Sequence, residues 1–101
     1  MVEDDSVIQV HGIVIVPTRR EVFIEGKPVT LTKGEFLLLR FFATHAGVAY
    51  TRQQIIDAVQ GSDYPVTIRS VDVQVTGLRK KLGDLGRAIE TVRGVGYRFR
   101  E

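Results

Sequence analysis

Hydrophobic and polar residues alternate along the first third of the chain before the spacing becomes helical. Four short runs rich in β-branched residues, separated by turn residues, lie between residues 7 and 31: VIQV, IVIV, VFIE and PVTL. Such a two-residue period predicts a four-stranded antiparallel sheet with hairpin turns. Residues 1–6 are acidic, and we interpret them as a linker remnant. The folded domain is therefore expected over residues 7–101.

Three helices are predicted after the sheet. Residues 32–35 (TKGE) and 51–54 (TRQQ) have the capping-box pattern, so a helix is expected to begin at each. Gly47 is expected to end the first of these helices. The Gly and Pro residues of the segment 61–66 predict a loop. A third helix then follows over residues 67–82, with Thr67 as its N-cap and Gly83 as its stop.

The third predicted helix has two chemically different faces. Val71, Val75, Leu78 and Leu82 form one stripe at helical spacing, which predicts contact with the core. The opposite face is basic and polar, and it carries an apolar residue and a glycine: Arg69, Val73, Thr76, Gly77 and Lys80, flanked by Asp72, Gln74 and Arg79. A helix that lies against DNA uses cations for phosphates and methyl groups for thymine. An ordinary basic amphipathic helix is the alternative that this segment alone leaves open.

The last predicted element is a β-hairpin formed by residues 89–92 and 97–100, with RGVG at its tip. Two helices joined by a short break and followed by a basic hairpin are typical of a winged helix-turn-helix. The predicted fold class is therefore α+β: a winged helix-turn-helix with an N-terminal four-stranded antiparallel sheet, three helices and a C-terminal β-hairpin wing.

Charge is unevenly distributed along the 101 residues. Residues 1–65 contain six Lys/Arg and eight Asp/Glu, a balance of −2, whereas residues 66–101 contain eight and four, a balance of +4. A basic C-terminal third favours a polyanionic partner. The chain has no cysteine, and no segment has the pattern of a signal peptide or a membrane span. We therefore expect a cytoplasmic protein.

Motifs for catalysis or cofactor binding are not found. Residues 94–96 (GVG) are not followed by a helix, so they do not form a dinucleotide-binding loop. His11 and His45 fall in different predicted elements without a Cys or carboxylate partner at ligand spacing, which argues against a metal site. No nucleophile and base are paired. We predict that the chain is not an enzyme and that it needs no cofactor.

Five motifs occur in order along the chain: LTKGEFLLL (31–39), TR (51–52), RSVDV (69–73), LRKKL (78–82) and TVRGVGY (91–97). Together they resemble the OmpR/PhoB family of response-regulator DNA-binding domains. This resemblance implies sequence-specific double-stranded DNA binding, with the helix 67–82 in the major groove and the wing 89–100 at the minor groove. By position, it implies DNA-binding roles for Arg52, Arg69, Asp72, Val73, Gln74, Thr76, Gly77, Arg79, Lys80, Thr91, Arg93 and Tyr97.

Specific roles follow for some of these residues. Arg93, at the wing tip, is expected to enter an A·T-rich minor groove, with a solvated hairpin arginine as the alternative. Val73 is expected to contact a thymine methyl group, with a helix-capping contact within the protein as the alternative. Asp72 either accepts a hydrogen bond from a cytosine amine or pairs with Arg69 or Arg79 within the protein.

The two lysines near the end of the helix are expected to differ. Lys80 is predicted to contact a phosphate, as is Arg79, whereas Lys81 on the flank is expected to be merely solvated. The chain also departs from the family at Gln60, where a Trp is usual, and at Gln74, where His is frequent. Gly77 stands where the family commonly has a long polar or basic side chain. We expect Gly77 either to remove a base contact or to let the helix sit deeper in the groove.

The resemblance also implies partners. Ser62, Asp63 and Tyr64 lie in the loop that faces RNA polymerase in this family, although the loop also fits a plain connector. An N-terminal receiver domain, phosphorylated by a cognate sensor kinase, would drive dimerisation on tandem half-sites, and the isolated domain would be a monomer. Two alternatives stay open: a receiver-less, membrane-anchored activator, and a winged-helix protein–protein interaction module that docks an acidic partner.

Overall fold

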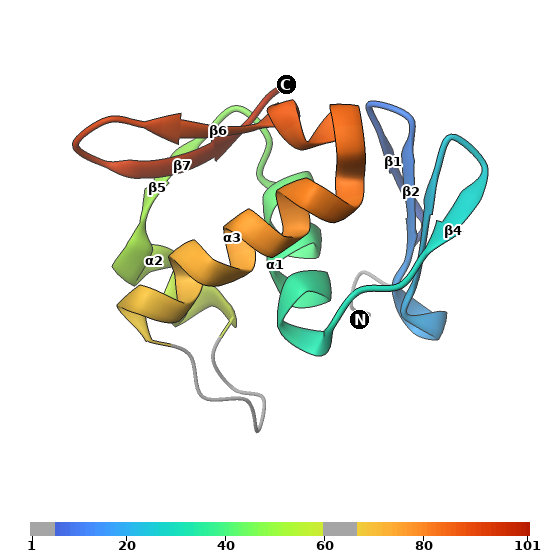
Figure 1. The fold of residues 1–101 in the computed structure, drawn as a ribbon, viewed down its shortest axis with the longest axis horizontal. Helices are drawn as coiled ribbons and strands as arrows, with labels where there is room; N and C mark the ends of the chain where they lie inside the picture. Colours follow the sequence, from blue (N-terminus) through green and yellow to red (C-terminus); the bar gives the residue numbers. More distant parts are fainter. Residues whose placement is uncertain (1–5, 60–66) are drawn as a thin grey trace.

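The computed structural model describes residues 6–59 and 67–101 (Figure 1). Its first part is the predicted four-stranded antiparallel sheet, in the order β1-β2-β3-β4: β1 (Ile8–Val10), β2 (Ile13–Val16), β3 (Glu21–Ile24) and β4 (Lys27–Val29). A short 3₁₀ helix, η1 (Pro17–Arg19), lies between β2 and β3. Because the period is two, alternate residues point to the same side, and Ile13, Ile15 and Val22 are buried against the rest of the domain.

The helices of the described ranges begin at the predicted caps. They are α1 (Lys33–Thr44), α2 (Arg52–Val59) and α3 (Ile68–Leu82). Thr32 and Thr51 form both hydrogen bonds of their capping boxes, with Glu35 and Gln54 respectively. The expectation that Gly47 ends α1 is wrong. The last helical residue is Thr44, whose hydroxyl bonds the Arg40 and Phe41 carbonyls of the preceding turn.

A short strand between α1 and α2, β5 (Ala49–Thr51), was not predicted. It pairs with β7 (Gly96–Phe99), which also pairs with β6 (Ile89–Val92), so the predicted hairpin belongs to a three-stranded sheet of order β5-β7-β6. The segment between α3 and the hairpin is a 3₁₀ helix, η2 (Gly83–Ala88). The wing is therefore anchored to the domain along a full strand and not only through its ends.

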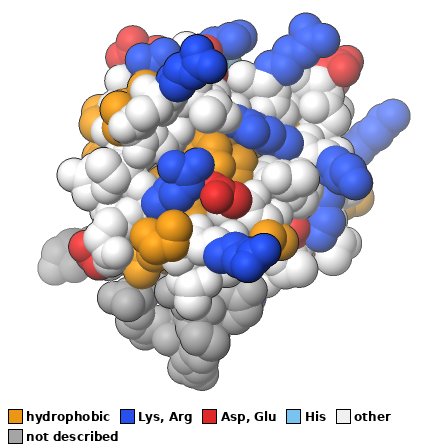
Figure 2. All heavy atoms as spheres, turned by 60° about the vertical axis from the view of Figure 1, so that its left-hand side comes forward, with side chains coloured by type: hydrophobic (Ala, Val, Ile, Leu, Met, Phe, Trp, Pro, Cys, Tyr) orange, Lys and Arg blue, Asp and Glu red, His pale blue; other side chains and the backbone are white. Residues whose placement is uncertain are grey.

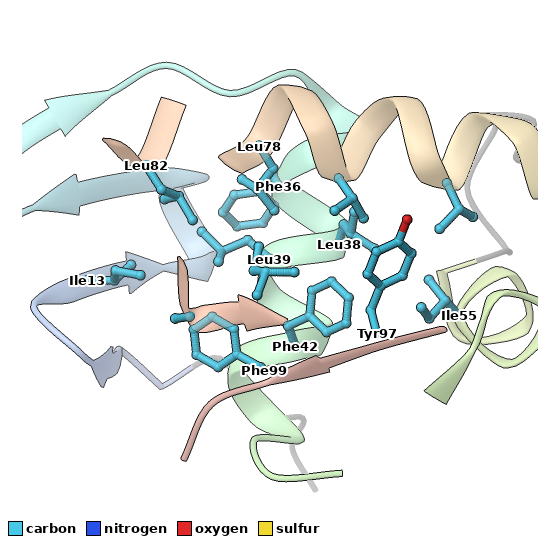
Figure 3. Packing of buried hydrophobic residues seen from close by; sticks show 14 of the residues in the cluster. Ile13, Phe36, Leu38, Leu39, Phe42, Ile55, Leu78, Leu82, Tyr97 and Phe99 are labelled. Carbon is cyan, nitrogen blue, oxygen red and sulfur yellow. The ribbon is translucent and has the colours of Figure 1, made fainter. Parts of the chain in front are cut away.

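The hydrophobic core surrounds α1 (Figure 3). Phe36, Leu38, Leu39 and Phe42 of this helix are at most 4% exposed, and Phe42 stacks on Phe99 of β7 with ring centroids 6.4 Å apart. Burial of each such side chain stabilises the fold by about 1.5–3 kcal/mol. In Figure 1 the wing projects at one end, the four-stranded sheet lies at the other, and α3 crosses between them. None of the described helices is long and apolar enough to cross a membrane.

Candidate nucleic-acid interface

The core fixes which side of α3 faces outward. Its N-terminus is capped by Thr67, as predicted. Ser70 completes a capping box, which was not predicted. The predicted stripe of Val71, Val75, Leu78 and Leu82 is at most 2% exposed. The opposite side is exposed at Arg69, Val73, Thr76 and Lys80. Val73 is 65% exposed, so the unusual apolar residue does lie on the outer surface.

The wing adds an exposed cation beside this helix. Arg93 and Thr91 are exposed, and Gly94 has a positive φ of 79°, which a glycine adopts without strain in the hairpin turn. In the face drawn in Figure 2, Lys and Arg side chains outnumber acidic ones, and apolar side chains lie between them. Within residues 6–59 and 67–101, Arg69, Lys80 and Arg93 make no ion pair. These three cations are therefore available to an anionic partner.

Other predicted site residues are held together in one network. Asp72 Oδ1 accepts hydrogen bonds from Arg52 Nε at 2.7 Å and from the Tyr97 hydroxyl at 2.5 Å. The Arg52 guanidinium carbon also lies 5.2 Å from the centre of the Tyr97 ring. The intramolecular alternative considered for Asp72 named Arg69 or Arg79 as its partner. The structure shows Arg52 instead, because the first turn of α2 packs beside α3.

Arg79 links α3 to the wing. Its Nε and Nη2 donate hydrogen bonds to the Ile89 carbonyl at 3.0 and 2.6 Å, and Nη2 also donates to Thr91 Oγ1 at 2.9 Å. Its guanidinium carbon lies 5.5 Å from the centre of the Tyr97 ring, a cation–π distance. The Tyr97 ring is thus contacted by two arginines, Arg52 and Arg79. Tyr97 itself is only 5% exposed, so its place in the wing is mainly inside the fold.

The network changes the acidity of its members. Hydrogen bonds from the Tyr97 hydroxyl and from the Arg52 guanidinium hold the pKa of the Asp72 carboxyl below its ordinary value, and the bond from Tyr97 has the larger effect. Burial raises the pKa of Tyr97, and the bond to Asp72 raises it further. The same carboxylate raises the pKa of Arg52. All three shifts favour a charged Asp72–Arg52 pair with a neutral tyrosine.

The structure corrects the expected position of Gly77. A Cβ built on this residue would lie 2.6 Å from Oε2 of Glu35, so the position faces α1 and not the outer surface. The helical spacing placed it outside because Gly77 lies at the edge between the two faces of α3. The glycine is explained by the close approach to Glu35. Both versions of the expectation about Gly77 and the groove stay predictions, since this contact does not test how the helix meets DNA.

Lys81 is also not merely solvated. Its Nζ donates to Oε1 of Glu35 at 2.7 Å, and the Glu35 side chain is only 9% exposed. Burial alone raises the pKa of Glu35, but the hydrogen bonds from Lys81 and from the Thr32 backbone outweigh it, so the pKa lies below its ordinary value. The capping box identified Glu35 as a helix-start residue. No signal in the sequence connected it with a lysine 46 residues away.

Gln60 and the loop residues Ser62, Asp63 and Tyr64 lie outside the described residues. Gln74 is half-buried on α3, between the core stripe and the outer face.

Known proteins share this fold and are similar in sequence. Residues 26–99 match the family model described as the C-terminal domain of transcriptional regulatory proteins. The chain belongs to this family. The phosphate regulon transcriptional regulatory protein PhoB of Pseudomonas aeruginosa is 43% identical over 98 residues, which cover 96% of this chain and 43% of PhoB. The chain thus spans less than half the length of this curated relative.

Two solved structures of this family are also similar. The DNA-binding domain of RstA from Klebsiella pneumoniae, solved in complex with the RstA box, has a TM-score of 0.80 and 36% identity, covering 94% of this chain and 97% of that one. The DNA-binding domain of CpxR from Escherichia coli has a TM-score of 0.79 and 29% identity, covering 95% and 97%. These matches confirm the predicted winged helix-turn-helix fold and the OmpR/PhoB resemblance. The family consists of transcription regulators and not of enzymes, as predicted.

Proposed function

We propose that this family member binds double-stranded DNA in a sequence-dependent way, as the output domain of a two-component transcriptional response regulator. The observation that carries the proposal is the exposed face of α3. Its cations and the exposed Val73 lie opposite the core stripe, next to a wing whose tip carries the exposed Arg93. RstA, of the same fold and 36% identical, was solved in complex with its DNA box, which supports the proposal.

In the proposed complex, α3 lies in the major groove. Arg69, Val73, Gln74 and Thr76 are placed to meet base edges or nearby phosphates, with Val73 against a thymine methyl group. Lys80 contacts a phosphate and supplies affinity without sequence information.

The wing and α2 contact the DNA on either side of α3. Arg93 enters the adjacent minor groove, where a narrow A·T-rich segment has a strongly negative potential. Beneath these contacts lies the network of hydrogen bonds and cation–π contacts that includes Arg52, Arg79, Thr91 and Tyr97. The remaining polar atoms of Arg52, Arg79 and Thr91 approach the phosphate backbone, while the Tyr97 hydroxyl stays on Asp72. This requires no side-chain rearrangement because the network already exists without DNA.

Selection of bound sequences from a random duplex pool tests this function. We expect the wild-type domain to enrich one motif repeated in tandem. Val73→Ala should relax the preference at single positions, and Arg93→Ala should weaken binding beside an A·T step. The matched control is Arg19→Ala, an exposed arginine at the end of η1 that should leave the motif and the affinity unchanged.

Failure to enrich any sequence at low salt, with the fold intact, would contradict DNA binding. Binding of an acidic protein by the same face would then explain the basic surface. The two functions differ in salt dependence, because the affinity for DNA falls as a power of salt concentration through counterion release.

The wider assembly is proposed from the family resemblance. A receiver domain outside this chain, phosphorylated by a cognate sensor kinase, would promote dimerisation on tandem half-sites, while the domain alone is a monomer in the cytoplasm. The loop with Ser62, Asp63 and Tyr64 would face RNA polymerase. Reporter transcription with Tyr64→Ala tests the loop: activation should fall while operator affinity stays unchanged.

A further inference from the structure

Asp72 joins three elements of the interface. The donors to its Oδ1 come from Arg52 in the first turn of α2, 20 residues away, and from Tyr97 in β7, 25 residues away. Figure 3 shows the Tyr97 hydroxyl pointing toward α3. Since both hydrogen bonds end on one oxygen, a single carboxylate fixes the α2 arginine and the wing relative to the recognition helix.

Arg79 and the tyrosine ring complete this arrangement. Arg79 bonds the Ile89 carbonyl and Thr91, so the wing is also tied to α3 through its first strand, β6. The Arg52 and Arg79 guanidinium carbons lie 5.2 and 5.5 Å from the centre of the Tyr97 ring. Through its hydroxyl on Asp72 and its ring near two arginines, Tyr97 links the wing to both α2 and α3.

We propose that Asp72 is a positioning residue that holds Arg52 and the wing in place for DNA, and that it does not itself read a base. This inference rests on the DNA-binding function proposed above. Free arginine side chains lose rotamer freedom when they bind, and an arginine already held by a carboxylate loses less. The carboxylate is an unfavourable charge beside phosphates, but it is already paired with Arg52 at 2.7 Å.

The proposal and simple charge repulsion predict opposite changes in DNA affinity for Asp72→Ala. Asp72→Ala removes a negative charge from a surface that faces phosphates, so repulsion alone predicts tighter binding to every duplex. Loss of positioning predicts weaker binding instead. A base-reading role predicts a third result, in which discrimination is lost at one base pair only.

The experiment measures the Kd of the 101-residue chain for the selected duplex with Asp72→Ala, Arg52→Ala and the double variant. We expect Asp72→Ala to weaken binding about tenfold with an unchanged sequence preference, in the range of coupled neighbouring residues. The double variant should lose less affinity than the two single losses added together, since part of the effect of Asp72 passes through Arg52. Asp72→Asn keeps an acceptor oxygen and should recover part of the loss.

Asp57→Asn is the matched control. Asp57 is exposed on α2 and accepts a hydrogen bond only from Gln53, on its own helix, among the described residues. Its substitution removes the same charge without touching the network, so the Kd should change by less than about twofold at ordinary salt. Tighter binding by Asp72→Ala, additive effects in the double variant, or a loss confined to one base pair would each overturn the proposal.

A measurement without DNA separates this proposal from the function on which it rests. Asp72→Ala should lower the pKa of Tyr97 in an alkaline titration of phenolate absorbance, and Tyr97→Phe identifies the signal among the three tyrosines. An unchanged tyrosine titration would overturn the coupling whatever the DNA result. A wild-type chain that binds no duplex would overturn DNA binding and Asp72's role in it. The titration would still decide whether Asp72 holds the wing.

Discussion

Gly77 of α3 lies directly against the buried carboxylate of Glu35 on α1. A Cβ at position 77 would come within 2.6 Å of Glu35 Oε2, closer than non-bonded atoms approach. The other oxygen of the same carboxylate accepts hydrogen bonds from the Thr32 backbone N–H at 3.0 Å and from Lys81 at 2.7 Å. The absence of a side chain at position 77 therefore lets α3 pack on the capped start of α1.

Gly77→Ala should lower the stability of the domain by about 1 kcal/mol, even though alanine favours a helix by about 1 kcal/mol over glycine. The Glu35 carboxylate would have to turn away, which weakens charge-assisted hydrogen bonds worth about 1.5–3 kcal/mol each. Urea unfolding measures the change. In a Glu35→Ala background the obstacle is gone, so the same substitution should become stabilising. A Gly77→Ala variant that is more stable than wild type would contradict the close contact.

The adjacent lysines at the end of α3 should have different roles. Lys81→Ala removes the partner of a buried carboxylate and should destabilise the domain by about 1–2 kcal/mol, less than a fully buried pair because Lys81 is 38% exposed. Lys80→Ala should leave stability within about 0.5 kcal/mol, since its side chain is exposed. For DNA binding the order reverses: Lys80→Ala should lower the slope of log affinity against log salt by about one. Equal effects of both variants in either assay would contradict this division.

Acid should remove the contribution of Glu35 to stability. Its pKa in the folded protein is lowered from the ordinary value of 4.5, so the folded state binds its proton less tightly than the unfolded state. The stabilisation by Glu35 is therefore complete above pH 4.5, and it is lost as the pH falls through the lower pKa of the folded state. The difference in unfolding free energy between wild type and Glu35→Gln should shrink over that interval. A difference that grows with acidity would contradict the sign of the shift.

The two glycines of the wing should tolerate alanine differently. A Cβ on Gly96 would overlap the Tyr50 carbonyl oxygen of β5, so Gly96→Ala should disrupt the β5–β7 pairing and unfold at markedly lower urea concentration. Gly94 is open to solvent but has a positive φ, so Gly94→Ala should cost only about 1 kcal/mol of backbone strain. Amide exchange in β5 distinguishes them: Gly96→Ala should accelerate it, and Gly94→Ala should not.

Features that depend on near neighbours were predictable from the sequence. The period-two runs gave the four-stranded sheet, and the capping boxes at Thr32 and Thr51 located two helix starts, because these signals act over about four residues. The core stripe of α3 followed from its spacing in the same way. The family motifs then identified the winged fold, which the structural matches confirm.

Contacts between distant residues required the tertiary structure. Strand β5 has only three residues and forms because β7 is beside it. The partners of Asp72 and Lys81 lie 20 to 46 residues away, and several oppositely charged residues were equally suitable by sequence. Helical spacing gave the angle of Gly77 relative to its neighbours but not the position of α1 beside it. The sequence by itself determined the four-stranded sheet, the starts of the helices and the chemistry of the outer face of α3, since these arise from local signals. Only packing decided which charges pair, because an ion pair forms where the folded backbone brings two side chains within a few ångströms.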